Sequence, residues 1–130
     1  MINSFSFIVP GPPVGKERPR KGKHGFYTPK RTHDYEKLVQ TYALEAQLLK
    51  KKADGESWHW NFWAFYKVII KIYYEGKGGR LPDIDNIIKS ILDGMNKVAY
   101  MDDNCVRKIE AAIIQNAPAT EVHVEVSYET

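Results

Sequence analysis

An alternating stretch in the middle of the chain restricts the fold most strongly. Between residues 58 and 74, apolar residues occupy every second position and polar residues recur between them. Side chains of a β-strand point alternately to the two faces of a sheet, so a period of two predicts a strand. The stretch is long for one strand, so it is expected to bend or to begin irregularly. The apolar positions are Trp58, Trp60, Phe62, Ala64, Tyr66, Val68, Ile70, Ile72 and Tyr74.

Six other segments complete the expected order of elements. Residues 4–9, 106–114 and 121–128 have strand patterns, and a short strand fits residues 25–28. Residues 32–52 and 86–97 have apolar side chains at three- and four-residue spacing, which predicts two helices. This order predicts an α+β fold in which a mixed sheet of about four to five strands packs with two main helices. We expect one domain over residues 1–130.

Helical spacing also predicts the buried faces and the helix ends. Gly55 follows the first helix, as is common after a helix end, and Asp85 is the expected N-cap of the second. The Trp-rich stretch at 58–65 is expected to pack in the core, with a dimer surface as the alternative. Expected core residues are Tyr35, Leu38, Val39, Tyr42, Ala46 and Leu49 in the first helix, and Ile87, Ile88, Ile91, Leu92 and Met95 in the second.

Positive charge is concentrated in one loop. Residues 16–31, which we call the basic arm, hold seven Lys or Arg and one acid, Glu17, and so carry a charge of +6. Because the net charge of the whole chain is +3, the remaining residues sum to −3. A basic arm on an acidic body favours a polyanionic partner such as DNA, although a solvated loop fits the charge equally well. Phe26 and Tyr27 within the arm either anchor it or stack on bases. The candidate DNA-binding residues are Lys16, Arg18, Arg20, Lys21, Lys23, Lys30 and Arg31.

The cysteine count and the N-terminal sequence indicate a cellular compartment. Cys105 is the single cysteine, so no intrachain disulfide can form and a reducing compartment is the simplest expectation. The N-terminal residues lack the basic start and long apolar run of a signal peptide. Lys67 and Lys71 interrupt the best candidate for a membrane helix. We therefore expect a soluble, cytoplasmic protein.

Aspartates gather around the second predicted helix. The segment from residue 82 to residue 103 reads PDIDNIIKSILDGMNKVAYMDD and contains five aspartates and no glutamate. Asp85, Lys89 and Asp93 lie at four-residue steps along one helical face. Asp83 precedes that helix, and the pair Asp102–Asp103 follows it after a short loop. We expect four or five carboxylates and one ammonium group to meet at one end of the sheet.

Such a cluster would suit a hard divalent cation. Mg²⁺ prefers oxygen ligands and commonly binds one or two carboxylates together with water and phosphate. A metal in this position orients or deprotonates water, and Lys89 would face the phosphate. The same residues also fit structural roles: a helix cap, a turn, an i,i+4 ion-pair ladder and a solvated connector. Composition and spacing alone leave both interpretations open.

Other metal motifs do not fit. An EF-hand loop that began at Asp83 would need glycine at its sixth position and glutamate at its twelfth, where this chain has Ile88 and Gly94. Nucleotide-sugar transferases with an Asp-x-Asp motif usually need a larger nucleotide-binding domain than this chain length allows. The sequence has no phosphate-binding glycine loop and no zinc pattern.

The aspartate motif resembles the RusA family of crossover-junction endodeoxyribonucleases, also called Holliday-junction resolvases. The resemblance rests on Pro82-Asp83-x-Asp85-Asn86-x-x-Lys89-x-x-x-Asp93 with the distant Asp102–Asp103 pair, and extends to Lys16-x-Arg18-Pro19-Arg20, Tyr27-Thr28-Pro29 and Tyr35-Glu36. It covers the chain from Phe7 to about Glu110 and is weakest at residues 58–66. The family often has glutamine where this chain has Cys105, and this departure is expected to bear on activity or specificity.

The resemblance implies a homodimeric enzyme that uses Mg²⁺, or Mn²⁺ in its place, to nick two strands of a four-way DNA junction symmetrically. It implies Asp83, Asp85 and Asp103 as metal ligands, Lys89 as a functional lysine, and Asp102 as a further candidate ligand. Family members are frequent in bacteriophages and prophages. Two alternatives are a junction- or single-strand-binding module that does not cut, and a less selective Mg²⁺-dependent nuclease.

Overall fold

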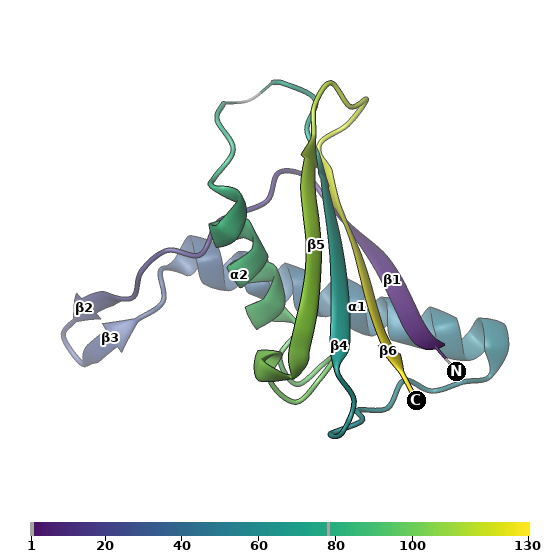
Figure 1. The fold of residues 1–130 in the computed structure, drawn as a ribbon. Helices are drawn as coiled ribbons and strands as arrows, with labels where there is room; N and C mark the ends of the chain where they lie inside the picture. Colours follow the sequence, from purple (N-terminus) through teal and green to yellow (C-terminus); the bar gives the residue numbers. More distant parts are fainter. Residues whose placement is uncertain (1, 78) are drawn as a thin grey trace.

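The computed structural model describes residues 2–77 and 79–130 and confirms the α+β fold. A four-stranded sheet has the order β1-β6-β4-β5, and β2 and β3 form a separate two-stranded ribbon (Figure 1). The elements are β1 (Ile2–Pro10), β2 (Arg20–Gly22), β3 (Gly25–Tyr27), α1 (Lys30–Asp54), β4 (Tyr66–Tyr73), α2 (Ile84–Gly94), the short 3₁₀ helix η1 (Asp103–Cys105), β5 (Val106–Ile114) and β6 (Glu121–Glu129).

The sheet is mixed because its connections differ in length. β6 pairs antiparallel with both β1 and β4, whereas β4 and β5 are parallel and are joined through α2. Parallel neighbours need a crossover, and a helix between them runs in the opposite direction to the strands. α2 therefore begins near the end of β4 and finishes near the start of β5 (Figure 1). This direction decides where the aspartates lie.

One face of the sheet holds the core. Alternate residues of the strands, such as Val68 and Ile70 in β4 and Val124 in β6, are buried in one cluster with residues of both helices. The side chains between them, such as Lys71 and Glu125, are exposed. The strand predictions at 4–9, 106–114 and 121–128 are confirmed, and each strand is slightly longer or equal in length.

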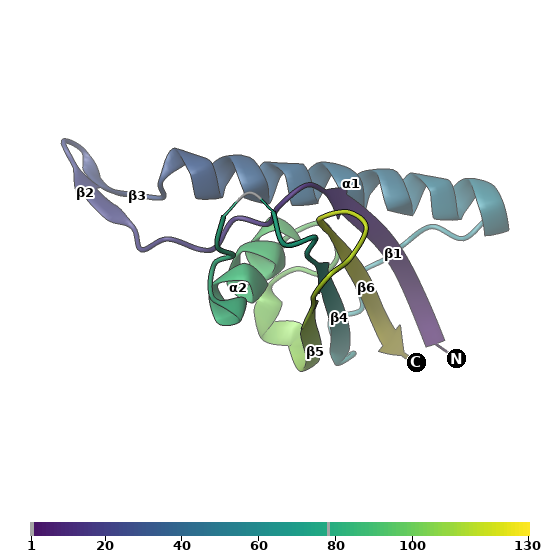
Figure 2. The same ribbon diagram turned by 90° about the horizontal axis from the view of Figure 1, so that it is seen from above.

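α1 is longer than predicted and buries a narrower stripe. It packs mainly against β1 and α2, and Thr32, Tyr35, Val39 and Ala43 are buried while the expected core residues Leu38 and Leu49 are exposed. Figure 2 shows α1 extending along the molecule past the sheet. Gly55 has a φ of 78°, the left-handed conformation that favours glycine after a helix, so its predicted role is confirmed.

α2 differs from its prediction at both ends. It begins at Ile84 with Asp83 as its N-cap residue, so the prediction that Asp85 is the N-cap was wrong. It ends at Gly94, where a Cβ would lie 2.8 Å from the carbonyl oxygen of Glu36 and 2.9 Å from Cβ of Val39. Close packing of α2 on α1 therefore requires glycine there.

Residues 58–65 form an irregular segment before β4, so the strand prediction was wrong for this part. Trp58 packs edge-on against Phe5 and Tyr128, with ring centroids 4.6 and 5.2 Å apart, which confirms core packing for this residue. Trp63 and Phe65 are exposed, so core packing was wrong for them. Among the described helices, none is long and apolar enough to cross a membrane.

Candidate functional site

The first part of the site lies at the N-terminal end of α2. Asp83 is the N-cap residue, and its backbone carbonyl accepts hydrogen bonds from the amides of Asn86 and Ile87, both at 3.1 Å. Asp85 follows in the first turn, where a negative charge suits the helix dipole. Both carboxylates are exposed, and neither has a hydrogen-bond or ion-pair partner among the described residues. They are accessible to a ligand.

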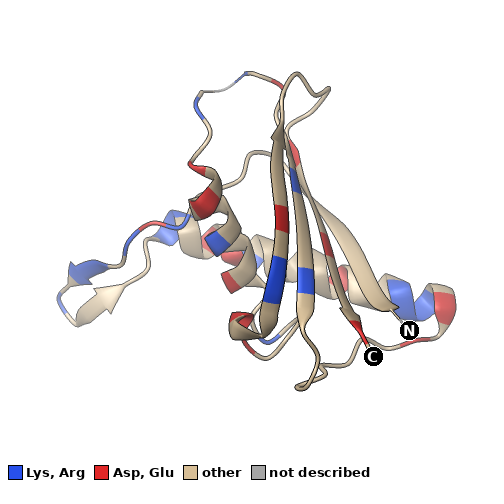
Figure 3. Ribbon diagram, viewed as in Figure 1, with Lys and Arg blue, Asp and Glu red and all other residues tan. Residues whose placement is uncertain are grey.

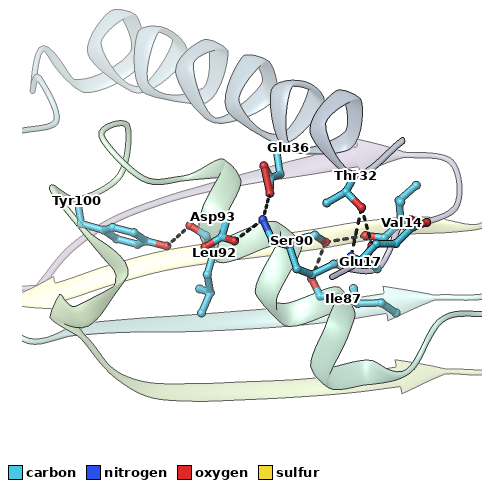
Figure 4. A network of polar contacts seen from close by, with 11 residues as sticks. Val14, Glu17, Thr32, Glu36, Ile87, Ser90, Leu92, Asp93 and Tyr100 are labelled. Carbon is cyan, nitrogen blue, oxygen red and sulfur yellow. Dashed lines mark hydrogen bonds and ion pairs between the residues drawn. The ribbon is translucent and has the colours of Figure 1, made fainter. Parts of the chain in front are cut away.

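Lys89 lies on the exposed face of α2 without an ion-pair partner in the described part of the chain. The expected ladder of Asp85, Lys89 and Asp93 is therefore absent. Asp93 instead pairs with Nζ of Lys16 at 3.0 Å, and the same ammonium group donates to Glu36 at 2.8 Å. Figure 4 shows Glu36 and Asp93 projecting toward each other from the two helices. Lys16 thus joins α1 to α2, and we call these three residues the clamp.

The clamp changes the interpretation of Lys16. Partial burial lowers the pKa of its ammonium group, but hydrogen bonds to Glu36 and Asp93 outweigh this and raise the pKa above 10.5. Sequence reasoning assigned Lys16 to DNA and did not single out Glu36 as its partner. The available signal was the presence of both residues in the motifs that carry the family resemblance.

The root of the basic arm is fixed to α2. The backbone amide of Lys16 donates to the carbonyl of Asn86 at 2.8 Å, and the hydroxyl of Ser90 donates to the carbonyl of Val14 at 2.6 Å. Gly15 passes so near Pro82 that an added Cβ would lie 2.9 Å from its Cβ. The path of residues 14–16 is therefore defined by packing as well as by hydrogen bonds.

Beyond this root, the arm forms a ribbon that projects from the body. Arg20 and Lys21 lie on β2, and Lys23 lies in the turn between β2 and β3. Figure 3 shows this basic ribbon to one side of α2, whose acidic residues are red. Phe26 and Tyr27 are exposed on β3, so they do not anchor the arm to the body. Arg18, Lys30 and Arg31 are also exposed, and Lys30 pairs with Asp34 at 2.6 Å.

The second part of the site lies where η1 leads into β5. The carboxylate of Asp102 accepts a hydrogen bond from the amide of Asn104 at 3.1 Å. This bond is the main cause that lowers the pKa of Asp102, and a hydrogen bond with Asp103 lowers it further. Partial burial raises the pKa of Asp103, and the hydrogen bond to Asp102 and the charge of Asp93 raise it further. Asp103 is therefore the first of the pair to take up a proton. Cys105 lies next to this pair, and its thiol donates to Oδ1 of Asn104 at 3.5 Å.

The structure divides the aspartates into two groups. Asp83 and Asp85 lie at the start of α2, whereas Asp93, Asp102 and Asp103 interact near its end. At 1.5 Å per residue, Asp83 and Asp93 are about 15 Å apart along the helix. Within residues 2–77 and 79–130, no three His, Cys, Asp or Glu side chains are arranged to hold a metal ion. The expected meeting of four or five carboxylates at one end of the sheet is therefore not seen within one chain.

The fold and the charges together point to a class of protein. Accessible carboxylates beside a projecting basic ribbon suit a protein that acts on a nucleic acid. The sequence matches the family model described as Endodeoxyribonuclease RusA over residues 10–125, nearly the whole chain. The chain belongs to this family, whose members act on branched DNA, and membership supports a Holliday-junction-resolving endonuclease in general. No match was found among curated proteins.

Proposed function

We propose that this protein is a homodimeric endonuclease that resolves four-way DNA junctions by Mg²⁺-dependent, symmetric phosphodiester hydrolysis. The observation that carries the proposal is the pair of exposed, unpartnered carboxylates of Asp83 and Asp85, beside a basic ribbon, in a chain of the RusA family. Bare carboxylates close to a polyanion repel it unless a cation lies between them. A divalent ion is the simplest means of bringing these acids to a phosphate.

The donor set fits a hard divalent ion. Asp83, Asp85 and Asp103 would hold it, with Asp102 as a further ligand, because all four supply the carboxylate oxygens that Mg²⁺ or Mn²⁺ prefers. Asp102 and Asp103 interact with each other and with Asp93, so a cation bound there would offset the repulsion between their charges. When bound, the ion would supply an activated water and stabilise charge on the phosphate. Lys89 would contact the phosphate oxygens.

The division of the acids supports a dimer. β5 is an edge strand that pairs only with β4 in the described sheet. Asp103 is the first residue of η1, which leads directly into β5, whereas Asp83 lines a pocket with Ile113 and Gln115 at the other end of the same strand. In an antiparallel pair, the start of one strand lies beside the end of the other. Two-fold pairing through β5 would thus bring Asp103 of the partner subunit toward Asp83, and a second site would form by symmetry.

The basic ribbon would bind the arms of the junction through phosphates. Arg18, Arg20, Lys21, Lys23, Lys30 and Arg31 are exposed on it or at its base, and such contacts give affinity without reading base sequence. Phe26 and Tyr27 would stack on bases, because neither is packed against the body. Structure selectivity would then come from the shape of the DNA.

The test is cleavage of a labelled synthetic four-way junction in Mg²⁺, with linear duplex and flap substrates for comparison. The wild type should nick the junction at two symmetric positions, and Asp85→Asn should bind but not nick it. Equal cutting of all substrates would identify a less selective nuclease. Binding without any cut in Mg²⁺ and Mn²⁺ would identify a junction-binding module.

A further inference from the structure

Three large aromatic side chains project from the segment before β4. Phe62, Trp63 and Phe65, which we call the aromatic tip, are 64%, 93% and 71% exposed. Scattered exposed apolar residues are ordinary, but three large aromatics within four positions form a patch of the kind that marks a binding surface.

The aromatic tip stands on a fixed base. The indole N–H groups of Trp58 and Trp60 donate to the carbonyls of Ala99 and Val98, at 2.8 and 3.1 Å. These carbonyls belong to the connection between α2 and the Asp102–Asp103 pair, so the two segments are tied together. An exposed side chain on a rigid base loses little backbone entropy on binding, which favours its use as a contact.

Short-range hydrogen bonds hold the segment from within. The amide of Asn61 donates to the hydroxyl of Tyr66 at 2.9 Å, and the amide of Trp63 donates to Oδ1 of Asn61 at 3.0 Å. Because Tyr66 is buried at the start of β4, these bonds fix the backbone of the tip relative to the sheet. The exposure of the aromatic rings is therefore a property of the folded segment.

The aromatic tip lies at the same end of the sheet as the second group of acids. Tyr66 follows the tip directly and pairs with Val106, which follows η1 directly (Figure 1). The guanidinium carbon of Arg107 lies 5.5 Å from the ring centroid of Phe65. The tip thus combines aromatic faces with a cation at the end of the sheet where the Asp102–Asp103 pair lies.

We propose that the aromatic tip stacks on bases that are unstacked at the branch of a DNA junction, and that Arg107 contacts the adjoining phosphate. This inference rests on the proposed endonuclease function, because Asp103 must face DNA if it holds the catalytic ion. Every base has a π-face, so stacking on aromatics tolerates any sequence and suits an enzyme that recognises DNA shape. The cation beside Phe65 favours DNA over a second copy of this chain as the occupant.

The experiment uses four-way junctions with 2-aminopurine next to the branch base, where its fluorescence rises when that neighbouring base is drawn out of the stack. Wild type should raise this fluorescence, and Trp63→Ala and Phe62→Ala should each reduce the rise and weaken binding about 10-fold. Affinity for linear duplex should change little, because its bases stay stacked. Leu48→Ala is the matched control, since Leu48 is 62% exposed on α1 and should behave as wild type.

Each other outcome overturns the inference. Unchanged 2-aminopurine signal and affinity in both tip variants, with a normally binding wild type, would exclude stacking while the endonuclease proposal stands. Loss of the dimer in light scattering of the tip variants without DNA would show that a second copy covers the tip. A wild type that does not bind junctions would refute the proposed function itself. Thermal unfolding of each variant identifies any effect that comes from misfolding.

Discussion

The two ends of α2 carry the same kind of side chain in opposite settings. At the N-terminal end, Asp83 and Asp85 are exposed and their carboxylates have no partners among the described residues. At the other end, Asp103 is partly buried, shares a hydrogen bond with Asp102 and lies within the field of Asp93. One end is accessible, and at the other end the acids interact with one another. Among the described residues, neither end holds three side chains placed to bind a metal ion.

Removing one carboxylate at the accessible end should have the largest effect. Asp85→Asn keeps the size of the side chain and removes a charge that would hold the metal. We expect cleavage of a four-way junction to fall at least about 100-fold, because a metal ion contributes several kcal/mol of transition-state stabilisation. Single-turnover cleavage assays measure the loss, and gel-shift assays in Ca²⁺ should show retained binding. Wild-type cleavage by this variant would remove Asp85 from the site.

Mixing two inactive variants tests whether the two ends cooperate across a dimer. If Asp103 of one subunit completes the site of the other, a mixed dimer of Asp85→Asn and Asp103→Asn contains one intact site and one doubly altered site. After subunit exchange, about half of the dimers are mixed, so roughly a quarter of the wild-type nicking should return. Cleavage assays on mixed and unmixed samples measure this recovery.

The control mixture combines Asp83→Asn with Asp85→Asn. Both changes lie at the same end of α2, so no mixed dimer contains an intact site and no activity should return. Recovery in neither mixture, with subunit exchange demonstrated, would show that each site forms within one chain. The ends of α2 would then have to approach each other on metal binding.

The basic ribbon differs from both ends of α2 because its contribution to junction affinity should depend on the salt concentration. Replacing Lys21 and Lys23 by alanine removes two candidate phosphate contacts. The slope of log affinity against log salt should decrease by about 2, since each neutralised phosphate contributes about 0.9. Titrations of a junction at several salt concentrations measure the slope. Lys51→Ala with Lys52→Ala, at the far end of α1, is the matched control and should leave it unchanged.

Several features of the molecule could be predicted from local sequence. The alternation in β4 and β6 and the glycine after α1 depend on neighbours within a few residues, and they were predicted correctly. The bonds of Trp58 and Trp60 to residues 98–99 join segments about forty residues apart, and the pairing of Lys16 with Asp93 is longer still. Such contacts leave no periodic signal, so the irregular segment and the clamp were missed.

The position of the acids could have been inferred from topology. A helix that joins two parallel strands runs against them, so residues just before it and residues just after it lie at opposite ends of the sheet. Asp83 precedes α2 and Asp103 follows it. Sequence reasoning placed the acids on one helical face but did not follow the direction of the chain. The resemblance implied these residues as a set, without indicating that the ends of α2 separate them.

The clamp joins α1 to α2 near the end of α2, and breaking it should destabilise the fold moderately. Glu36→Gln weakens a partly buried, charge-assisted hydrogen bond to Lys16, so the free energy of unfolding should fall by about 1–2 kcal/mol. Urea unfolding at pH 7 measures the change. Asp34→Asn is the control, because its pair with Lys30 is exposed and should contribute nothing measurable. Equal losses in both variants would contradict a special role for the clamp.

The smallest expected effect is a pH dependence of the difference in unfolding free energy between wild type and Glu36→Gln. The clamp raises the pKa of Lys16 above its ordinary value of 10.5, so the ammonium group is favoured in the folded state. Its contribution is fully present below pH 10.5 and is lost as the pH rises through the folded-state pKa. The difference in unfolding free energy between wild type and Glu36→Gln should therefore stay constant from pH 7 to pH 10 and shrink above it. A difference that disappears below pH 9 would show that the charge on Lys16 does not hold α2 to α1.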